Sequence, residues 1–391
     1  MNTSTKEDTA NKLKLKPDVS LYNRVEGVAP PSKTNFAQME LWIEFKTNSS
    51  GVAFRDPEDT TEEARRSAIE QGSFAPNTVE AMDARGQLAH YAGAQHSLQF
   101  RHFSFSVVIE GDCARFLRWD PAGTVVTAAF NYRENPEILA EFLWRFDQLS
   151  AKDRGHDDSI RPAQLEDDVD ARVREKLQIK DKKIPLFEYD MPGLEGHAYG
   201  PQPPYQNRSL VSRCTRSLPV AWIPKAGVGS AEACTENHSV LGGNTRPGKD
   251  DSWSQERIVY MKDTWRFLSD SPGVDVLPEH EIYAKLHRAK TPNIPKLVAG
   301  ADVPNGKTKT QEMVRAPWLC VKPRVSPYQH YRLVLGTVGR ALSTFRCTKE
   351  LVTGVLDGMK GVLTESYSHP NTLTNEHDSP LACVRCGKDP A

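Results

Sequence analysis

The sequence lacks long hydrophobic runs, an excess of one charge and a cysteine framework. No stretch of about 18 apolar residues occurs, and the start MNTSTKEDTANKLK has no hydrophobic segment, so we expect neither a membrane span nor a signal peptide. Lys and Arg number 50 against 51 for Asp and Glu, so the charge balance favours neither nucleic acid nor a membrane surface as a partner. The 7 cysteines are odd in number and mostly isolated, which favours an intracellular protein of the cytoplasm or the nucleus.

Length and composition predict two domains with irregular connections. A chain of 391 residues exceeds the usual size of one domain, and 27 prolines with 25 glycines indicate long loops. Charge is dense from Lys152 to Glu175, which favours a linker or a solvated helix, and residues 191–209 are rich in Gly, Pro and Tyr, which favours a loop. We expect this division: disordered residues 1–10, an α/β domain over 11–150, a linker over 151–209, a second domain over 210–362, and a disordered tail over 363–391.

The first domain is predicted to contain a mixed sheet. Its strands are expected where apolar and polar side chains alternate, as on strands that bury one face. These places are residues 12–22, 39–46, 103–109, 114–119 and 124–129. One helix is expected to begin in the capping sequence at Asn77, and another at Asn135 with Pro136 at its first position.

Three residues of the first domain form a candidate metal-dependent catalytic site. Asp18 and Glu44 fall on predicted strands, and two carboxylates from adjacent strands can hold Mg²⁺ through their oxygen atoms. Lys46 follows Glu44 by two positions, so it points to the same face and could stabilise the charge that develops when water attacks a phosphodiester. Alternatively, Glu44 and Lys46 line the solvated face of a strand.

These residues resemble the PD-(D/E)xK nuclease-like fold. Residues 17–18 supply its leading Pro-Asp dipeptide, residues 44–46 its E-x-K tripeptide, and residues 87–91 the helical Q-x-x-x-Y of one branch of that superfamily. The resemblance implies a Mg²⁺-dependent nuclease, and nucleic acid is expected as a partner only under this alternative.

A lysine and a glutamate of the second domain occur in the order found in the ATP-binding part of a protein kinase. Lys262 ends an apolar run, so its ammonium is expected to emerge from a buried strand toward the α- and β-phosphates of ATP. Glu279 opens the next predicted helix and would hold Lys262, because Tyr283 and Leu286 then pack that helix; Glu281 is the alternative. Otherwise Lys262 is a solvated strand-end lysine, and Glu279 is a first-turn residue favoured by the helix dipole.

The chain is similar to the fungal-type protein kinase family over roughly residues 10–360. Residues 85–132 carry a Gly-Gln…Tyr-Ala helix, an Arg-x-Phe-x-Phe strand and an Arg-Trp-Asp hairpin. Further matches are residues 259–265, 278–295, 330–335 and 339–345. The resemblance implies a phosphotransferase that uses ATP and Mg²⁺ on a protein substrate. Gly242 and Gly243 are the candidates for its Gly-rich loop, although they lack the G-x-G-x-x-G form.

The family pattern stops after Met359. Neither an H-R-D-type Asp nor a D-F-G motif follows, so we expect a pseudokinase truncated before the catalytic loop, its sequence ending through gene decay or through reading past an intron or a frame shift. Cys383 and Cys386 form a lone C-x-x-C, for which a zinc site with His369 and His377 is the alternative to a disordered tail.

Together these patterns predict an α/β plus α+β architecture. An N-terminal mixed-sheet nuclease-like domain is expected to precede an incomplete protein-kinase-like small lobe. Three functions remain open: an inactive kinase relative that binds a nucleotide, a Mg²⁺-dependent nuclease, and a non-catalytic interaction module.

Overall fold

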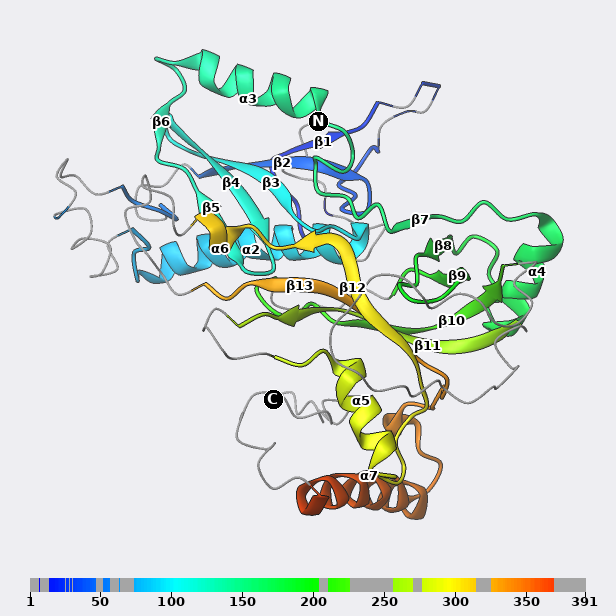
Figure 1. The fold of residues 1–391 in the computed structure, drawn as a ribbon. Coiled ribbons are helices and arrows are strands. Elements are labelled where there is room, and N and C mark those ends of the chain that lie inside the picture. The colour runs from blue at the N-terminus through cyan, green and yellow to red at the C-terminus, as the bar shows by residue number, and fades with distance from the viewer. Residues whose placement is uncertain are drawn as a thin grey trace, which may run out of the picture.

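The chain folds into a mixed α/β structure with two β-sheets (Figure 1). The computed structural model describes residues 14–24, 26–27, 31–46, 52–56, 74–203, 210–225, 256–269, 276–313 and 325–368, with Glu7, Ala29 and Glu63, and only the backbone of 361–368. No helix within the described ranges has the length and apolar character needed to cross a membrane.

The first sheet contains the strands expected for the N-terminal domain. In sheet order these are β1 (Val19–Tyr22), β2 (Met39–Lys46), β3 (Ser104–Glu110), β4 (Cys113–Asp120) and β5 (Gly123–Val126), with β6 (Phe130–Asn131) also paired to β4. β2 and β3 are parallel and the other pairs are antiparallel. A parallel pair needs a crossover connection, and α2 (Val79–Gln99) supplies it.

Two helices cover opposite faces of this sheet, as the strand period of two requires. Trp42 on β2 packs against α2 in one core cluster, whereas its neighbours Leu41 and Ile43 belong to the cluster on the α3 side. α3 (Pro136–Gln148) begins after Asn135 as expected and buries Phe146. α2 begins one residue later than expected, because the side chain of Thr78 rather than Asn77 accepts the hydrogen bond from the Ala81 amide.

The second sheet is antiparallel throughout. Its order is β12 (Leu297–Lys307), β13 (Tyr328–Leu335), β11 (Arg257–Phe267), β10 (Arg216–Pro224), β9 (Gly196–Pro201), β8 (Leu186–Tyr189) and β7 (Ile160–Pro162). The helices of this part of the chain are α4 (Asp167–Lys176), α5 (Glu279–Arg288), α6 (Thr310–Met313) and α7 (Thr348–Ser368), with a 3₁₀ turn at Leu342–Thr344.

The expected linker over residues 151–209 differs from the structure. β7, α4, β8 and β9 lie within it, and the three strands extend the second sheet, which therefore begins well before residue 210. Apolar side chains scattered among the charges make this possible, since Val173 of α4 packs with Leu186, Tyr199 and Ala221 of the strands. The first residues of the expected tail are helical, because α7 continues past residue 363 to Ser368, and the rest of that stretch lies outside the described residues.

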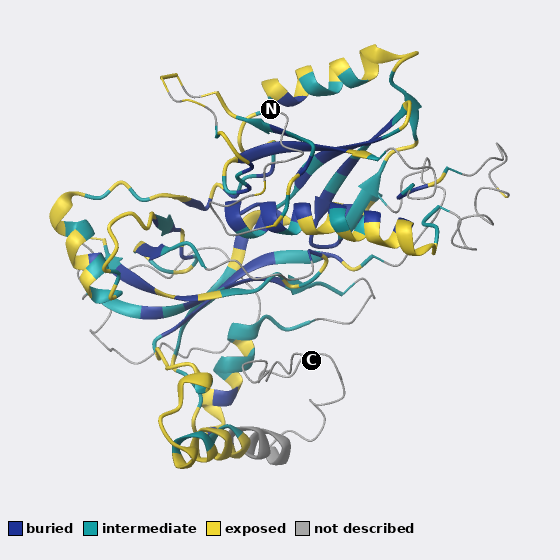
Figure 2. Cartoon of the chain, turned by 180° about the vertical axis from the view of Figure 1, so that it is seen from behind, coloured by how far each residue is buried: buried dark blue, intermediate teal, exposed yellow. Residues whose placement is uncertain are grey.

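The two sheets are stacked with α2 between them (Figure 1). Arg216 on β10 donates a hydrogen bond to the backbone carbonyl of His96 on α2, and the Arg216 guanidinium lies 5.0 Å from the Phe100 ring centroid. Asp120 at the end of β4 accepts hydrogen bonds from the backbone amides of Lys309 and Thr310, at 3.0 and 3.1 Å. Buried residues accordingly line both sheets and the α2 face between them (Figure 2).

Candidate functional sites

Lys262 and Glu279 form an ion pair on the face of the second sheet that α5 covers. Lys262 lies on β11, between Ser217 of β10 and Leu333 of β13. Its Nζ lies 2.6 Å from Oε2 of Glu279, the first residue of α5, and the two side chains are 22% and 15% exposed. Of the two glutamates considered, Glu279 therefore contacts the lysine, and Glu281 is exposed.

The packing of α5 explains why Glu279 is directed at Lys262. Tyr283 packs against the apolar side chains of β13, and Leu286 is buried, as the helical spacing predicts. The hydroxyl of Tyr331 accepts a hydrogen bond from the His280 amide at 2.9 Å, which ties the first turn of α5 to β13. The helix is thus held against the sheet at both ends.

The nuclease-like residues also come together, at the end of β2 that faces α2. Glu44 and Lys46 lie on the same face of β2, and Lys46 Nζ lies 2.9 Å from Glu44 Oε1. Asp18 directly precedes β1 and accepts a hydrogen bond from the Phe45 amide at 2.8 Å. The β1–β2 register pairs Val19 with Ile43, so Asp18 stands opposite Glu44.

Gln87 and Tyr91 of α2 complete this arrangement. Gln87 Nε2 donates hydrogen bonds to Glu44 Oε1 at 3.0 Å and to the Tyr91 hydroxyl at 2.6 Å, and Gln87 Oε1 accepts one from Lys46. The Tyr91 hydroxyl donates to the Lys16 carbonyl at 3.2 Å. The helical i, i+4 spacing thus connects the strand carboxylate to the segment that leads into β1.

Glu44 is a buried carboxylate with one unused oxygen. The residue is 4% exposed, and Oε2 has no hydrogen-bond partner among the described residues. Burial raises the pKa of Glu44, with Lys46 opposing the rise and the charge of Asp18 adding to it. Asp18 and Glu44 are thus the two carboxylates of this site that could hold a cation.

Two parts of the sequence prediction fall outside the described residues. Gly242 and Gly243 lie in the connection between β10 and β11, and the Cys383–Cys386 pair lies beyond α7. The described chain also contains a buried polar cluster that no sequence motif indicated, built from Asp157, Asp263 and His330 with their neighbours. Its residues come from distant segments, and only the strand alternation of His330 and Arg332 links any of them locally.

Comparisons with protein-family models, with curated proteins and with solved structures gave no match for this chain.

Proposed function

We propose that the chain is a nucleotide-binding relative of protein kinases, of the fungal-type family, that binds ATP with Mg²⁺ and does not transfer phosphate. The observation that carries the proposal is the 2.6 Å ion pair between Lys262 and Glu279. A kinase holds its phosphate-binding lysine on the third strand of the small lobe by a glutamate of the following helix. Here β9, β10 and β11 are successive antiparallel neighbours, and α5 is the next described helix after β11.

The geometry at Lys262 suits a phosphate ligand. An ammonium has three N–H donors, and among the described residues Glu279 accepts one, which leaves donors for phosphate oxygens. Glu279 fixes the direction of the side chain, so little rotamer entropy is lost when the ligand binds. Bound ATP would supply the phosphate charge that Lys262 neutralises. The sequence offers no H-R-D or D-F-G motif, so no residue is assigned to proton transfer or to a kinase metal.

The test is nucleotide binding to the full chain by calorimetry and thermal shift with MgATP. Lys262→Ala should weaken binding at least about 10-fold, since a charge-assisted phosphate contact is lost. Lys307→Ala, at an exposed position of β12, is the matched control and should bind as the unmodified chain does. If Lys262→Ala binds MgATP as tightly as the unmodified chain, the assignment of Lys262 to phosphate binding is wrong. If the chain transfers phosphate to a substrate, the assignment as an inactive relative is wrong.

The unused oxygen of Glu44 favours a second candidate, metal-dependent phosphodiester hydrolysis in the N-terminal domain. Asp18 and Glu44 would hold Mg²⁺, which supplies an activated water. Lys46, held by Glu44 and Gln87, would stabilise the charge that develops on the phosphate. The resemblance to the PD-(D/E)xK fold supports this assignment, because the E-x-K residues and the Q-x-x-x-Y residues meet at one place.

The test is nicking of supercoiled DNA with Mg²⁺ or Mn²⁺. Glu44→Gln should reduce the rate at least about 100-fold, because the amide cannot carry the charge that holds the metal. Glu80→Gln, on the exposed side of α2, should leave the rate unchanged. Nicking that survives in Glu44→Gln would show that another site, or a contaminant, is responsible.

A further inference from the structure

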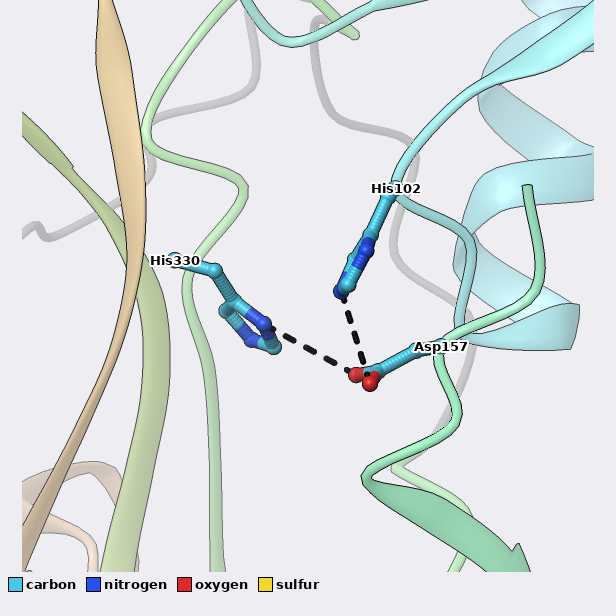
Figure 3. Close-up of side chains that lie close together, drawn as sticks. All are labelled: His102, Asp157 and His330. Carbon is cyan, nitrogen blue, oxygen red and sulfur yellow. Dashed lines mark ion pairs between the residues drawn. The ribbon is translucent and has the colours of Figure 1, made fainter. Parts of the chain in front are cut away.

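His102, Asp157 and His330 converge where the two halves of the molecule meet (Figure 3). His102 lies between α2 and β3, Asp157 lies between α3 and β7, and His330 is on β13. The backbone brings the first two together, because the His102 amide donates to the Gly155 carbonyl at 2.8 Å and the Asp157 amide donates to the Phe100 carbonyl at 2.9 Å.

A glycine permits this close approach. Gly155 has φ +97°, and a Cβ atom there would lie 1.9 Å from the Phe103 carbonyl oxygen. A side chain at position 155 would therefore push the two segments apart. The positions of His102 and Asp157 are thus fixed by the main chain rather than by flexible side chains.

The three side chains direct potential ligand atoms at one point, where Asp157 lies within ion-pair distance of both histidines. One ligand atom from each residue lies within 4.8 Å of the others. Asp157 Oδ1 is 3.4 Å from His102 Nε2, and Asp157 Oδ2 is 3.7 Å from His330 Nδ1. Both nitrogens are buried and have no hydrogen-bond partner among the described residues. His330 as a whole is only 1% exposed, so solvent does not supply that partner. Buried polar atoms are rarely left unpaired, so these two require an explanation.

The surroundings prepare His330 as a metal ligand. Its Nε2 lies 2.6 Å from Asp263 Oδ1, so Nε2–H donates to that carboxylate and the lone pair is on Nδ1, which faces Asp157. A carboxylate behind the imidazole is the usual second shell of a metal-bound histidine. Asp263 is itself held by Arg332 Nε at 2.9 Å, so the carboxylate that accepts from His330 is fixed in place.

Asp157 is prepared in a similar way. Its Oδ1 accepts hydrogen bonds from the amide and the hydroxyl of Ser159, the former at 2.9 Å, and its Oδ2 lies 3.2 Å from Arg332 Nη2. These contacts orient the carboxylate and leave a lone pair on Oδ2, the oxygen that faces His330 Nδ1. The positive charge of Arg332 beside Oδ2 also weakens the attraction of this carboxylate for a dication.

From this geometry we infer that His102, Asp157 and His330 bind one divalent transition-metal ion, with Zn²⁺ as the best match. Two imidazole nitrogens and one carboxylate oxygen suit zinc, whereas Mg²⁺ and Ca²⁺ prefer oxygen ligands. The ligand atoms move closer together on binding, since they now lie up to 4.8 Å apart and zinc holds nitrogen and oxygen at about 2.0–2.2 Å. His102 and Asp157 precede the second sheet in the chain and His330 belongs to it, so the ion joins the two halves.

The experiment measures metal binding by untagged full-length protein after chelator treatment. Zn²⁺ should bind at one equivalent per chain and raise the melting temperature, and Co²⁺ should give the visible absorption of a low-coordinate nitrogen and oxygen site. His102→Ala removes a ligand that is partly exposed, and it should weaken Zn²⁺ binding at least about 100-fold and abolish the Co²⁺ spectrum. His90→Ala, at an exposed position of α2, is the matched control.

Two results would overturn the assignment. One is a folded full-length protein that binds no stoichiometric Zn²⁺ or Co²⁺. The other is His102→Ala protein, folded by circular dichroism, that keeps the affinity and the Co²⁺ spectrum of the unmodified chain. His330→Gln serves as the second variant, because its amide can retain the hydrogen bond to Asp263 while removing the ligand nitrogen.

Discussion

Glu40 is a buried carboxylate that residues from three other segments contact. Arg101 Nη2 lies 2.9 Å from its Oε2, His156 Nε2 lies 3.1 Å from both oxygens, and Asn23 Nδ2 donates at 3.0 Å. Burial alone would raise the pKa of Glu40, but the hydrogen bond with His156 and the charge of Arg101 outweigh it and lower the pKa to about 2. The ionised form is therefore favoured by folding.

This shift predicts acid sensitivity that can be assigned to one residue. The pKa falls from 4.5 in the unfolded chain to about 2, so Glu40 contributes about 3 kcal/mol that is fully present above pH 4.5 and is lost as pH falls toward 2. In urea unfolding from pH 7 to pH 3, Glu40→Gln should be less stable at pH 7 and should lose less stability on acidification. Glu134→Gln, an exposed control, should follow the unmodified chain. Parallel pH profiles for Glu40→Gln and the unmodified chain would contradict the assignment.

The sequence predicted those side-chain contacts that follow from the spacing of residues along one strand or one helix. Glu44 and Lys46 share a strand face because side chains alternate, and Glu279 faces Lys262 because Tyr283 packs against β13. The cluster of His102, Asp157 and His330 was not predictable, because no periodicity relates residues that meet only after the two halves of the chain fold together. Tertiary packing, not sequence distance, sets those contacts.

At the scale of elements, the sequence predicts those that bury one clear apolar face. The expected strand at residues 39–46 coincides with β2, and the expected helix after Asn135 coincides with α3. Elements that the sequence did not predict include β7, β8 and β9, whereas α4 falls largely in the stretch expected as a linker or a solvated helix. α4 buries only Val173, and its acidic first turn and basic last turn are typical of a solvated helix, so composition alone gave no reason to place it beside a sheet. Short strands with few buried residues carry too weak a periodic signal.

The same argument explains why the stretch before residue 210 was expected to be a linker. Strands β8 and β9 form a hairpin whose register pairs Glu188 with Tyr199 and Tyr189 with Ala198. The inward side chains become apolar neighbours only when β10 lies beside β9, which requires residues after position 210. Residues 186–201 bury their apolar side chains only against a strand that comes later in the chain. Their composition alone therefore looks like that of a connecting segment.

At the scale of the whole molecule, Arg332 connects segments that are far apart in the chain. Its side chain is fully buried on β13, Nε lies 2.9 Å from Asp263 Oδ1, and Nη2 lies 3.2 Å from Asp157 Oδ2. Nη1 donates to the Asp190 carbonyl at 2.8 Å. Asp157 and Asp263 have pKa values well below the usual range, because contacts with His330 and Arg332, and for Asp157 also with His102, outweigh the effect of burial. The guanidinium therefore compensates two buried charges at once.

Arg332→Met should destabilise the protein by about 3–5 kcal/mol, since it leaves two carboxylates buried without their shared cation. Arg161→Met is the matched control, because Arg161 also bonds to Asp190 and to a second carboxylate, Glu188, but its side chain is 46% exposed. An exposed pair of this kind contributes less than about 1 kcal/mol. Urea unfolding followed by far-UV circular dichroism and by tryptophan fluorescence measures both variants, with Trp42 in the first sheet and Trp222 and Trp265 in the second. If the two halves depend on Arg332, both signals shift together to lower urea. A shift no larger than that of Arg161→Met would show that the junction is held by its apolar contacts instead.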